Sequence, residues 1–324
     1  MQTVIGNQLA TAIDHLQQQQ LVAIPTETVY GLAANALNEA AVIQIFEAKK
    51  RPRFNPLIVH VPTIQSINTY AHLQPLAEKL AHAFMPGPFT LLLPKTNVVP
   101  SLVTAGSNKV AIRIPQHPLT LELLQQLPFP LAAPSANVFG YVSPTTAQHV
   151  YKGLQGIIPY ILDGGACTVG VESTIVEVTN EHTVIVHRVG GIAVEAIAAV
   201  AGAPVILASE QQEATAPNTP GQLKSHYATT TPLMVGNVAS LIAQYPNQNI
   251  AVLGFNTLYP QLPEQNQYLL SPEGHLNQAA QRLFDTMRLL DTAGYDLIIA
   301  ENFPNEGLGR AINDRLHRAQ VQYK

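Results

Sequence analysis

The sequence predicts an α/β protein with a large mixed twisted sheet, helices and an open cleft, followed by a smaller Rossmann-like domain. Apolar runs typical of strands alternate with segments of helical periodicity along the 324 residues. The chain is 47% hydrophobic and 12% charged, which is ample material for a core. A change of composition near residue 203 predicts a first domain at 1–202, a linker at 203–231 and a second domain at 232–324.

The first domain is expected to begin with a helix, a strand and a second helix. Residues 7–19 can form a helix, and the apolar run "LVAIPT" follows as a strand. In 38–50, "NEAAVIQIFEAKK", apolar side chains recur at helical spacing and Asn38 is a suitable cap. Further helices are expected at 73–84 and 117–127 and after a Gly-Gly turn within 190–202, with strands at 56–61, 90–95, 109–114, 129–133, 158–162, 174–178 and 183–188.

The linker is rich in Ala, Pro, Thr, Ser and Gln and shows little periodic burial. After it, apolar strands again alternate with helices, which favours a parallel sheet between helix layers. The expected strands are "PLMVG", "IAVLGF" and "YDLIIAE", and the expected helices lie near 237–244, 275–293 and 307–321.

Composition argues against several classes of protein. The net charge of −4 and pI of about 6.2 disfavour a dedicated nucleic-acid binder, so no stable nucleic-acid binding is expected. Cys167 is the single cysteine, which excludes an internal disulfide or a cysteine zinc finger. No apolar run approaches the ~20 residues that span a membrane, and the N-terminus lacks the pattern of a signal peptide. A cytoplasmic protein without membrane partners is therefore expected.

Polar residues gather where the strands end. The segment 25–36, "PTETVYGLAANA", places small hydroxyl residues directly after an apolar strand, as a site for a small polar ligand would. "AKKRPRFNPLIVHV" at 48–61 places four cations at a helix end, where they could simply complement the helix dipole. Held between prolines and followed by Asn55, they also suit phosphate oxygens.

Two arginines and a second polar loop extend this pattern. Arg113 in "VAIRIP" either lies on an exposed sheet face or enters a cleft to hold a carboxylate or phosphate, and Arg188 ends the strand of "IVHRVGG". In "PLAAPSANVFGYVSPTTA", Ser135 and Asn137 supply a hydroxyl and an amide, while Ser143 and the proline after it fit the first positions of a helix. By itself His60 fits a packed or capping histidine, and Cys167 has no base beside it.

The usual nucleotide-binding and metal-binding motifs are absent from the sequence. It contains no G-x-x-x-x-G-K-[ST], no G-x-G-x-x-G after a strand and no H-E-x-x-H. No nucleophile with an adjacent base is evident either. The polar segments therefore indicate a site that binds anionic substrates and acts through positioning and charge neutralisation.

These segments together resemble the YrdC family. The order of "PTETVYGLAANA", "AKKRPRFNPLIVHV", "FMPGPFTLLLPK", "VAIRIP", "APSAN", "GVESTIV" and "HRVGG" is that of the family, and "APNTPGQLKSHYATTTPL" with the last domain is similar to its long form, the L-threonylcarbamoyladenylate synthases. The resemblance implies a nucleotidyltransferase that converts L-threonine, bicarbonate or CO2, and ATP with Mg2+ into threonylcarbamoyl-AMP and pyrophosphate. The product would pass to proteins that transfer the threonylcarbamoyl group to tRNA, and no tightly bound cofactor is expected.

The resemblance also implies roles for individual residues. Lys49, Arg51 and Arg113 would act in catalysis through their charge, and no residue is expected to bind a resident metal. The linker, with Thr219, would close over the site. The threonine pocket would be lined by Thr28, His60, Arg113, Ala133 and Ser173. ATP would be held by Arg51, Asn55, Lys109, Ser135, Asn137, Ser143, Arg188 and Thr219.

The chain departs from the family pattern at two positions: Lys50 stands where Gly is frequent, and Phe139 where Ser is common. Other functions compete with the synthase. An RNA-binding module or a nucleotide sensor would also use a basic cleft. A carbamoyl-transfer enzyme of the hydrogenase-maturation type has a related domain, but the single cysteine excludes the zinc fingers of such proteins.

Overall fold

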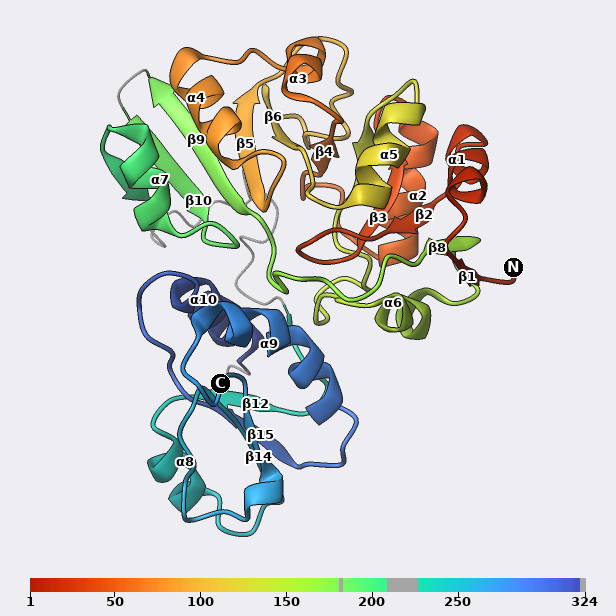
Figure 1. Ribbon diagram of the computed structural model, residues 1–324. Coiled ribbons are helices and arrows are strands. Elements are labelled where there is room, and N and C mark those ends of the chain that lie inside the picture. The colour runs from red at the N-terminus through yellow and green to blue at the C-terminus, as the bar shows by residue number, and fades with distance from the viewer. Residues whose placement is uncertain (181–182, 209–226, 321–324) are drawn as a thin grey trace.

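The computed structural model describes residues 1–180, 183–208 and 227–320 (Figure 1). We call the described residues up to 208 the first unit and 227–320 the second unit. The first unit contains one mixed sheet with the strand order β1-β8-β2-β3-β7-β4-β6-β5-β9-β10-β11. Its strands are β1 Val4–Gly6, β2 Val22–Ile24, β3 Gly31–Asn35, β4 Ile58–His60, β5 Phe89–Pro94, β6 Lys109–Arg113, β7 Leu131–Ala132, β8 Tyr160–Leu162, β9 Thr174–Asn180, β10 Thr183–Arg188 and β11 Val205–Leu207.

Helices pack on this sheet and bury its apolar side chains in two main clusters. The larger cluster includes residues of α2, α4, α6 and α7, and the smaller one includes residues of α1 and α5. The helices are α1 Leu9–Gln17, α2 Glu39–Lys49, α3 Ile64–Tyr70, α4 Pro75–Phe84, α5 Pro118–Gln126, α6 Ala147–Leu154 and α7 Val194–Ala201. The expected cap of α2 is confirmed, since Asn38 Oδ1 accepts a hydrogen bond from the Ala41 amide at 3.1 Å.

The second unit is a four-stranded parallel sheet between helices, which confirms the predicted Rossmann-like arrangement (Figure 1). Alternate side chains of β13 face opposite ways: Ala251 and Leu253 join a core with α9 and α10, whereas Ile250 and Val252 pack with α8. The elements are β12 Leu233–Val235, α8 Val238–Gln244, β13 Ile250–Gly254, the short 3-10 helix η1 Glu264–Asn266, β14 Gln267–Leu269, α9 Leu276–Leu290, β15 Leu297–Ala300 and α10 Gly309–Ala319.

The structure corrects several local expectations. Ser143 does not cap the helix that follows, because α6 begins at Ala147 and Thr146 accepts a hydrogen bond from the His149 amide. β11 lies inside the range expected to be a linker and pairs in parallel with β10, so the first sheet continues to Leu207. The strands β1, β3 and β14 and the helix α3 were not expected.

The two units share an apolar contact surface. Val29, Val142 and Val171 of the first unit belong to the same buried cluster as the core residues of α9 and α10. Gly170, at φ +79°, allows the closest approach, because a Cβ atom there would lie 2.5 Å from the carbonyl oxygen of Ala280 in α9. Among the described residues, no helix is both long and apolar enough to cross a membrane.

Candidate active site

A cavity lined by the first unit and by Tyr227 of the second gathers polar side chains from segments far apart in the sequence. His60 ends β4 and Arg113 ends β6, and the two residues are direct partners in the parallel β4–β6 pairing. Because side chains alternate along a strand, His60 shares its face with Ile58 and Arg113 shares its face with Ala111. The cavity is lined by Thr26, Val29, Gly31, Arg51, Ile58, His60, Arg113, Ala133, Pro134, Ser135, Glu172, Arg188 and Tyr227.

The connection between β2 and β3 forms one part of the lining. Thr26 Oγ1 donates to the Val29 carbonyl at 2.6 Å and accepts from the amides of Thr28 and Val29 at 3.1 and 3.2 Å. Its hydroxyl also contacts that of Thr28 at 2.8 Å. The hydroxyl therefore fixes the shape of the turn, which explains why small polar residues follow this strand. Thr26 reaches the cavity, while Thr28, predicted to bind threonine, lies fully buried beside it.

Arg113 enters the cavity paired with a carboxylate that sequence reasoning did not assign to the site. Its Nη2 lies 2.8 Å from Glu27 Oε1, and both side chains are buried. The other oxygen of Glu27 accepts the Gln116 amide at 3.0 Å, and Arg113 Nε donates to the Gly87 carbonyl at 3.3 Å. The buried cation of Arg113 is thus compensated and held in a fixed orientation.

Arg51 is held by backbone carbonyls. Its Nε and Nη2 donate to the carbonyls of Asn55 and Pro56 at 3.3 and 2.9 Å. Among the described residues no carboxylate pairs with it, and burial lowers its pKa to about 9. The amide group of Asn55 is fully buried and both its polar atoms lack a hydrogen-bond partner among the described residues. Arg51 lines the cavity and offers its cation there, whereas Asn55 is absent from the lining.

Lys49, which is predicted to act in catalysis, is absent from the lining of the cavity. Its ammonium donates to the carbonyls of Ser135 and Asn137 and so joins the end of α2 to the loop after β7. Burial, and then the charge of Arg51, hold the pKa of Lys49 well below its usual value. Lys49 therefore orients the loop that carries Ser135, which does line the cavity.

His60 is buried between the sheet and the cavity. Burial, followed by the positive charge of Arg113, lowers its pKa to about 3. The imidazole is therefore neutral at physiological pH, so it can donate or accept a hydrogen bond without adding charge. Ala133, whose amide donates to the Ile58 carbonyl at 3.0 Å, also lines the cavity.

The predicted serines divide into one that lines the cavity and two that support it. Ser135 is on the lining. Ser143 Oγ donates to Glu172 Oε1 at 2.6 Å, and Ser173 Oγ contacts Thr90 Oγ1 at 2.7 Å. Arg188, which lines the cavity, donates to the carbonyl and the hydroxyl of Ser173. Both buried serines hold the orientation of a charged side chain.

Among the predicted ATP ligands, Asn55, Lys109, Asn137 and Ser143 are absent from the lining of the cavity, and Thr219 cannot be placed. Asn137 donates its amide to the carbonyls of Val138 and Tyr141, and is absent from the lining. Lys109, at the end of β6 away from Arg113, pairs with Glu177 at 2.6 Å. Thr219 lies outside the described residues.

The two departures from the family pattern have local explanations. Lys50 adopts the left-handed conformation, with φ 52° and ψ 37°, at the end of α2. Glycine adopts this conformation without strain, which accounts for its frequency at the position. Phe139 lies beside Arg51, whose guanidinium is 6.0 Å from the ring centroid.

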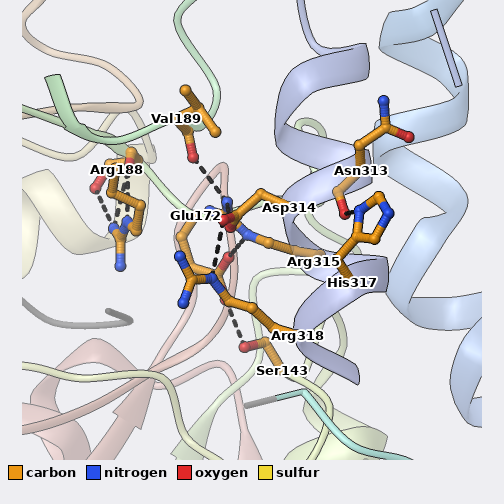
Figure 2. A network of polar contacts seen from close by, with 10 residues as sticks. Ser143, Glu172, Arg188, Val189, Asn313, Asp314, Arg315, His317 and Arg318 are labelled. Atoms are coloured by element: carbon orange, nitrogen blue, oxygen red, sulfur yellow. Dashed lines mark hydrogen bonds and ion pairs between the residues drawn. The ribbon is translucent and has the colours of Figure 1, made fainter. Parts of the chain in front are cut away.

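Glu172, Tyr227 and Arg315 are further charged or aromatic residues of the site that sequence reasoning missed. Glu172 and Tyr227 line the cavity, and Arg315 of α10 reaches Glu172 from the second unit (Figure 2). The signal in the sequence was weak: Glu172 is a lone acid in "GVESTIV", and Arg315 belongs to an amphipathic helix.

The arrangement suits anionic ligands. Arg51, Arg113 and Arg188 converge on one cavity together with small residues and a neutral histidine. In such a site a reaction is promoted by alignment and by compensation of developing charge. Among the described residues, no group of three or more His, Cys, Asp or Glu side chains is placed to hold a metal ion.

Comparison with known proteins gives a consistent result. The family model Sua5_yciO_yrdC, described as "Telomere recombination", matches residues 14–190, and the model of the threonylcarbamoyl-AMP synthase C-terminal domain matches 192–320. The threonylcarbamoyl-AMP synthase of Pyrococcus abyssi is 38% identical, over 95% of this chain and 92% of its own. That of Bacillus subtilis is 41% identical, over 96% and 92%. The crystal structure of P. abyssi Sua5 complexed with L-threonine superposes with a TM-score of 0.89 at 36% identity, covering 98% of this chain and 96% of that one.

Proposed function

The chain belongs to the Sua5/YciO/YrdC family in its two-domain threonylcarbamoyl-AMP synthase form, and we propose that it makes threonylcarbamoyl-AMP. The substrates are L-threonine, bicarbonate or CO2, and ATP, and the second product is pyrophosphate. The observation that carries this proposal is the convergence of three arginines and a neutral histidine on one cavity. The activity is that of a nucleotidyltransferase.

The chemistry explains the need for these cations. The amine of threonine adds to the carbon of CO2 and loses a proton, which gives a carbamate. A carbamate oxygen then attacks the α-phosphorus of ATP, and the bond from that phosphorus to the pyrophosphate oxygen breaks. Two anions must meet in this step, so guanidinium groups that flank both reduce the repulsion.

The different settings of the arginines suggest separate roles. Arg113, already paired with Glu27, would bind the single charge of the threonine carboxylate. His60 beside it would accept or donate a hydrogen bond without adding charge, and Ala133 would contact the side chain. Thr28 and Ser173 are fully buried and would hold the lining residues of this pocket in place.

Arg51 and Arg188 would bind the phosphates of ATP. The unpaired amide of Asn55 would complete the contacts with the phosphates. The hydroxyl of Ser135, in the loop after β7, would add a further contact from the lining of the cavity. Magnesium would enter as part of the ATP complex, held by the phosphate oxygens. The product would be passed on for threonylcarbamoyl transfer to tRNA.

The experiment that tests this function is pyrophosphate release by the full-length protein with ATP, Mg2+ and bicarbonate. We expect release that requires L-threonine and that L-serine supports poorly. A nucleotide sensor, the second candidate, would bind ATP without threonine-dependent release. An RNA-binding module would bind RNA in a salt-sensitive manner and release none.

A further inference from the structure

A buried ion pair joins the second unit to the wall of the cavity. Arg315 of α10 is fully buried, and its Nε donates to Glu172 Oε2 at 3.0 Å (Figure 2). Its Nη1 donates to the carbonyl of Val189 at 2.7 Å and also pairs with Asp314 at 2.8 Å. A long side chain of the second unit is thus fixed against the segment that carries Glu172.

Glu172 is an unexpected residue in a cavity for anions. Its carboxylate lines the same cavity as Arg51, Arg113 and Arg188 and would repel a triphosphate. Both of its oxygens are occupied, because Oε1 accepts from Ser143 at 2.6 Å and Oε2 accepts from Arg315. Burial alone would raise the pKa of Glu172, but the charges of Arg315 and then Arg188 hold it below its usual value.

We propose that Arg315 is a positioning residue for ATP: by neutralising Glu172 it keeps that carboxylate from offsetting the charge of Arg188 at the phosphates. Arg188 donates hydrogen bonds to Ser173, the residue next to Glu172. Without Arg315, the carboxylate of Glu172 would therefore lie near the guanidinium of Arg188 and offset its charge. Arg315 also lies over the ring of Tyr227, another residue of the lining, at 5.5 Å from its centroid. This inference rests on the proposed function, since it takes ATP as the ligand.

A second ion pair between the same helix and the first unit provides a matched control. Arg310, also on α10, pairs with Glu195 of α7, and the two side chains are 26% and 53% exposed. Neither residue lines the cavity. Removing this pair loosens a contact between the units without changing the charge at Glu172.

The test is titration of the full-length protein with Mg-ATP by calorimetry, with KM values for ATP and threonine. Arg315→Met should weaken ATP binding by about tenfold or more, because a buried carboxylate now faces the phosphates. The KM for threonine should change by less than about twofold, since threonine carries no net charge. In Glu172→Gln/Arg315→Met the carboxylate is gone, so ATP binding should return to within about threefold of the wild type. Arg310→Met should bind ATP as the wild type does.

Other outcomes overturn the inference. Equal losses for ATP and threonine without recovery in the double variant would show that Arg315 only holds the units together. The inference also fails if Arg315→Met binds ATP as Arg310→Met does. If Arg315→Met does not fold, Glu172→Gln and the double variant decide, because both should bind ATP to within about threefold of the wild type. A wild type without threonine-dependent pyrophosphate release contradicts the proposed function, whereas the ATP titration still decides the role of Arg315.

Discussion

Arg113 and Arg51 line one cavity but are held in different ways. Arg113 ends a strand and is paired with the buried carboxylate of Glu27. Arg51 follows a helix, is held by backbone carbonyls, and has no carboxylate partner among the described residues. A compensated arginine suits a ligand with one negative charge, whereas an uncompensated arginine suits a ligand with several. The same residue type can therefore serve two substrates, and its neighbours determine which.

The largest effect is expected from Arg51→Met. The kcat/KM for ATP should fall by about 10^3-fold, because a preorganised cation near the phosphates is lost. Thermal stability should fall only modestly, since the carbonyls of Asn55 and Pro56 lose a donor but no described carboxylate is left without its partner. Arg53→Met, in the same loop but exposed, is the control and should keep activity. A variant Arg51→Met with normal turnover would contradict the role given to this arginine.

Arg113→Lys should affect the other substrate. We expect the KM for threonine to rise roughly 30-fold, because lysine keeps the charge but not the fork that grips a carboxylate. The KM for ATP should stay nearly constant, and the melting temperature should remain close to that of the wild type because the lysine can still pair with Glu27. Steady-state kinetics with each substrate varied in turn measures this difference. An equal rise of both KM values would remove the distinction between the two arginines.

Asn55→Leu should separate stability from function. The buried amide has no partner in the described residues, so an apolar side chain of similar size should raise the free energy of unfolding by about 1 kcal/mol. ATP binding should weaken about tenfold through the lost hydrogen bonds.

Asn35 is the matched control for Asn55. It is also buried, but it donates to Gln19 and accepts from the Leu37 amide. Asn35→Leu should therefore destabilise the protein by about 1–3 kcal/mol. Denaturant unfolding of both variants gives the comparison, and a stability loss in Asn55→Leu equal to that in Asn35→Leu would show that Asn55 is structural.

The smallest effect concerns His60 and appears only at acidic pH. The folded pKa of about 3 lies below the ordinary 6.5, so only the unfolded chain takes up the proton between these values. The stabilisation is complete above pH 6.5 and is lost as the pH falls towards 3. Between pH 7 and 5.5 the wild type should lose about 1 kcal/mol more than His60→Gln. Melting curves that shift in parallel for both proteins would show that His60 titrates normally.

The sequence predicted the longer apolar runs well, whereas the strands β1, β3, β11 and β14 were not expected. Runs such as "TLLLPK" and "KVAIRI" become β5 and β6 because their side chains must be buried on pairing. β3 consists of "GLAAN", whose small residues carry no strand preference; it forms through pairing with β2 and β7. Ser143 and Pro144 have the signature of a helix start, but the chain makes that start at Thr146 and uses the serine for Glu172.

Parts of the site could not be predicted because their partners are distant in the sequence. Glu172 and Arg315 are 143 residues apart, and only the contact between the units joins them. Glu27 stands within "PTETVYGLAANA", yet its role depends on Arg113, which another strand supplies. Arg113 was identifiable because a cation in an apolar strand needs a reason, whereas the carboxylate that pairs with it was not.

Gly170 permits close packing between the two units. Gly170 carries only hydrogen atoms on its Cα, so the loop can rest on the backbone of α9, where even a methyl group would meet the carbonyl of Ala280 at 2.5 Å. Ordinary contact needs close to another ångström, so any side chain at position 170 would push this loop away from α9. The absence of a side chain there keeps the segment that carries Glu172 close to the second unit, which supplies Arg315.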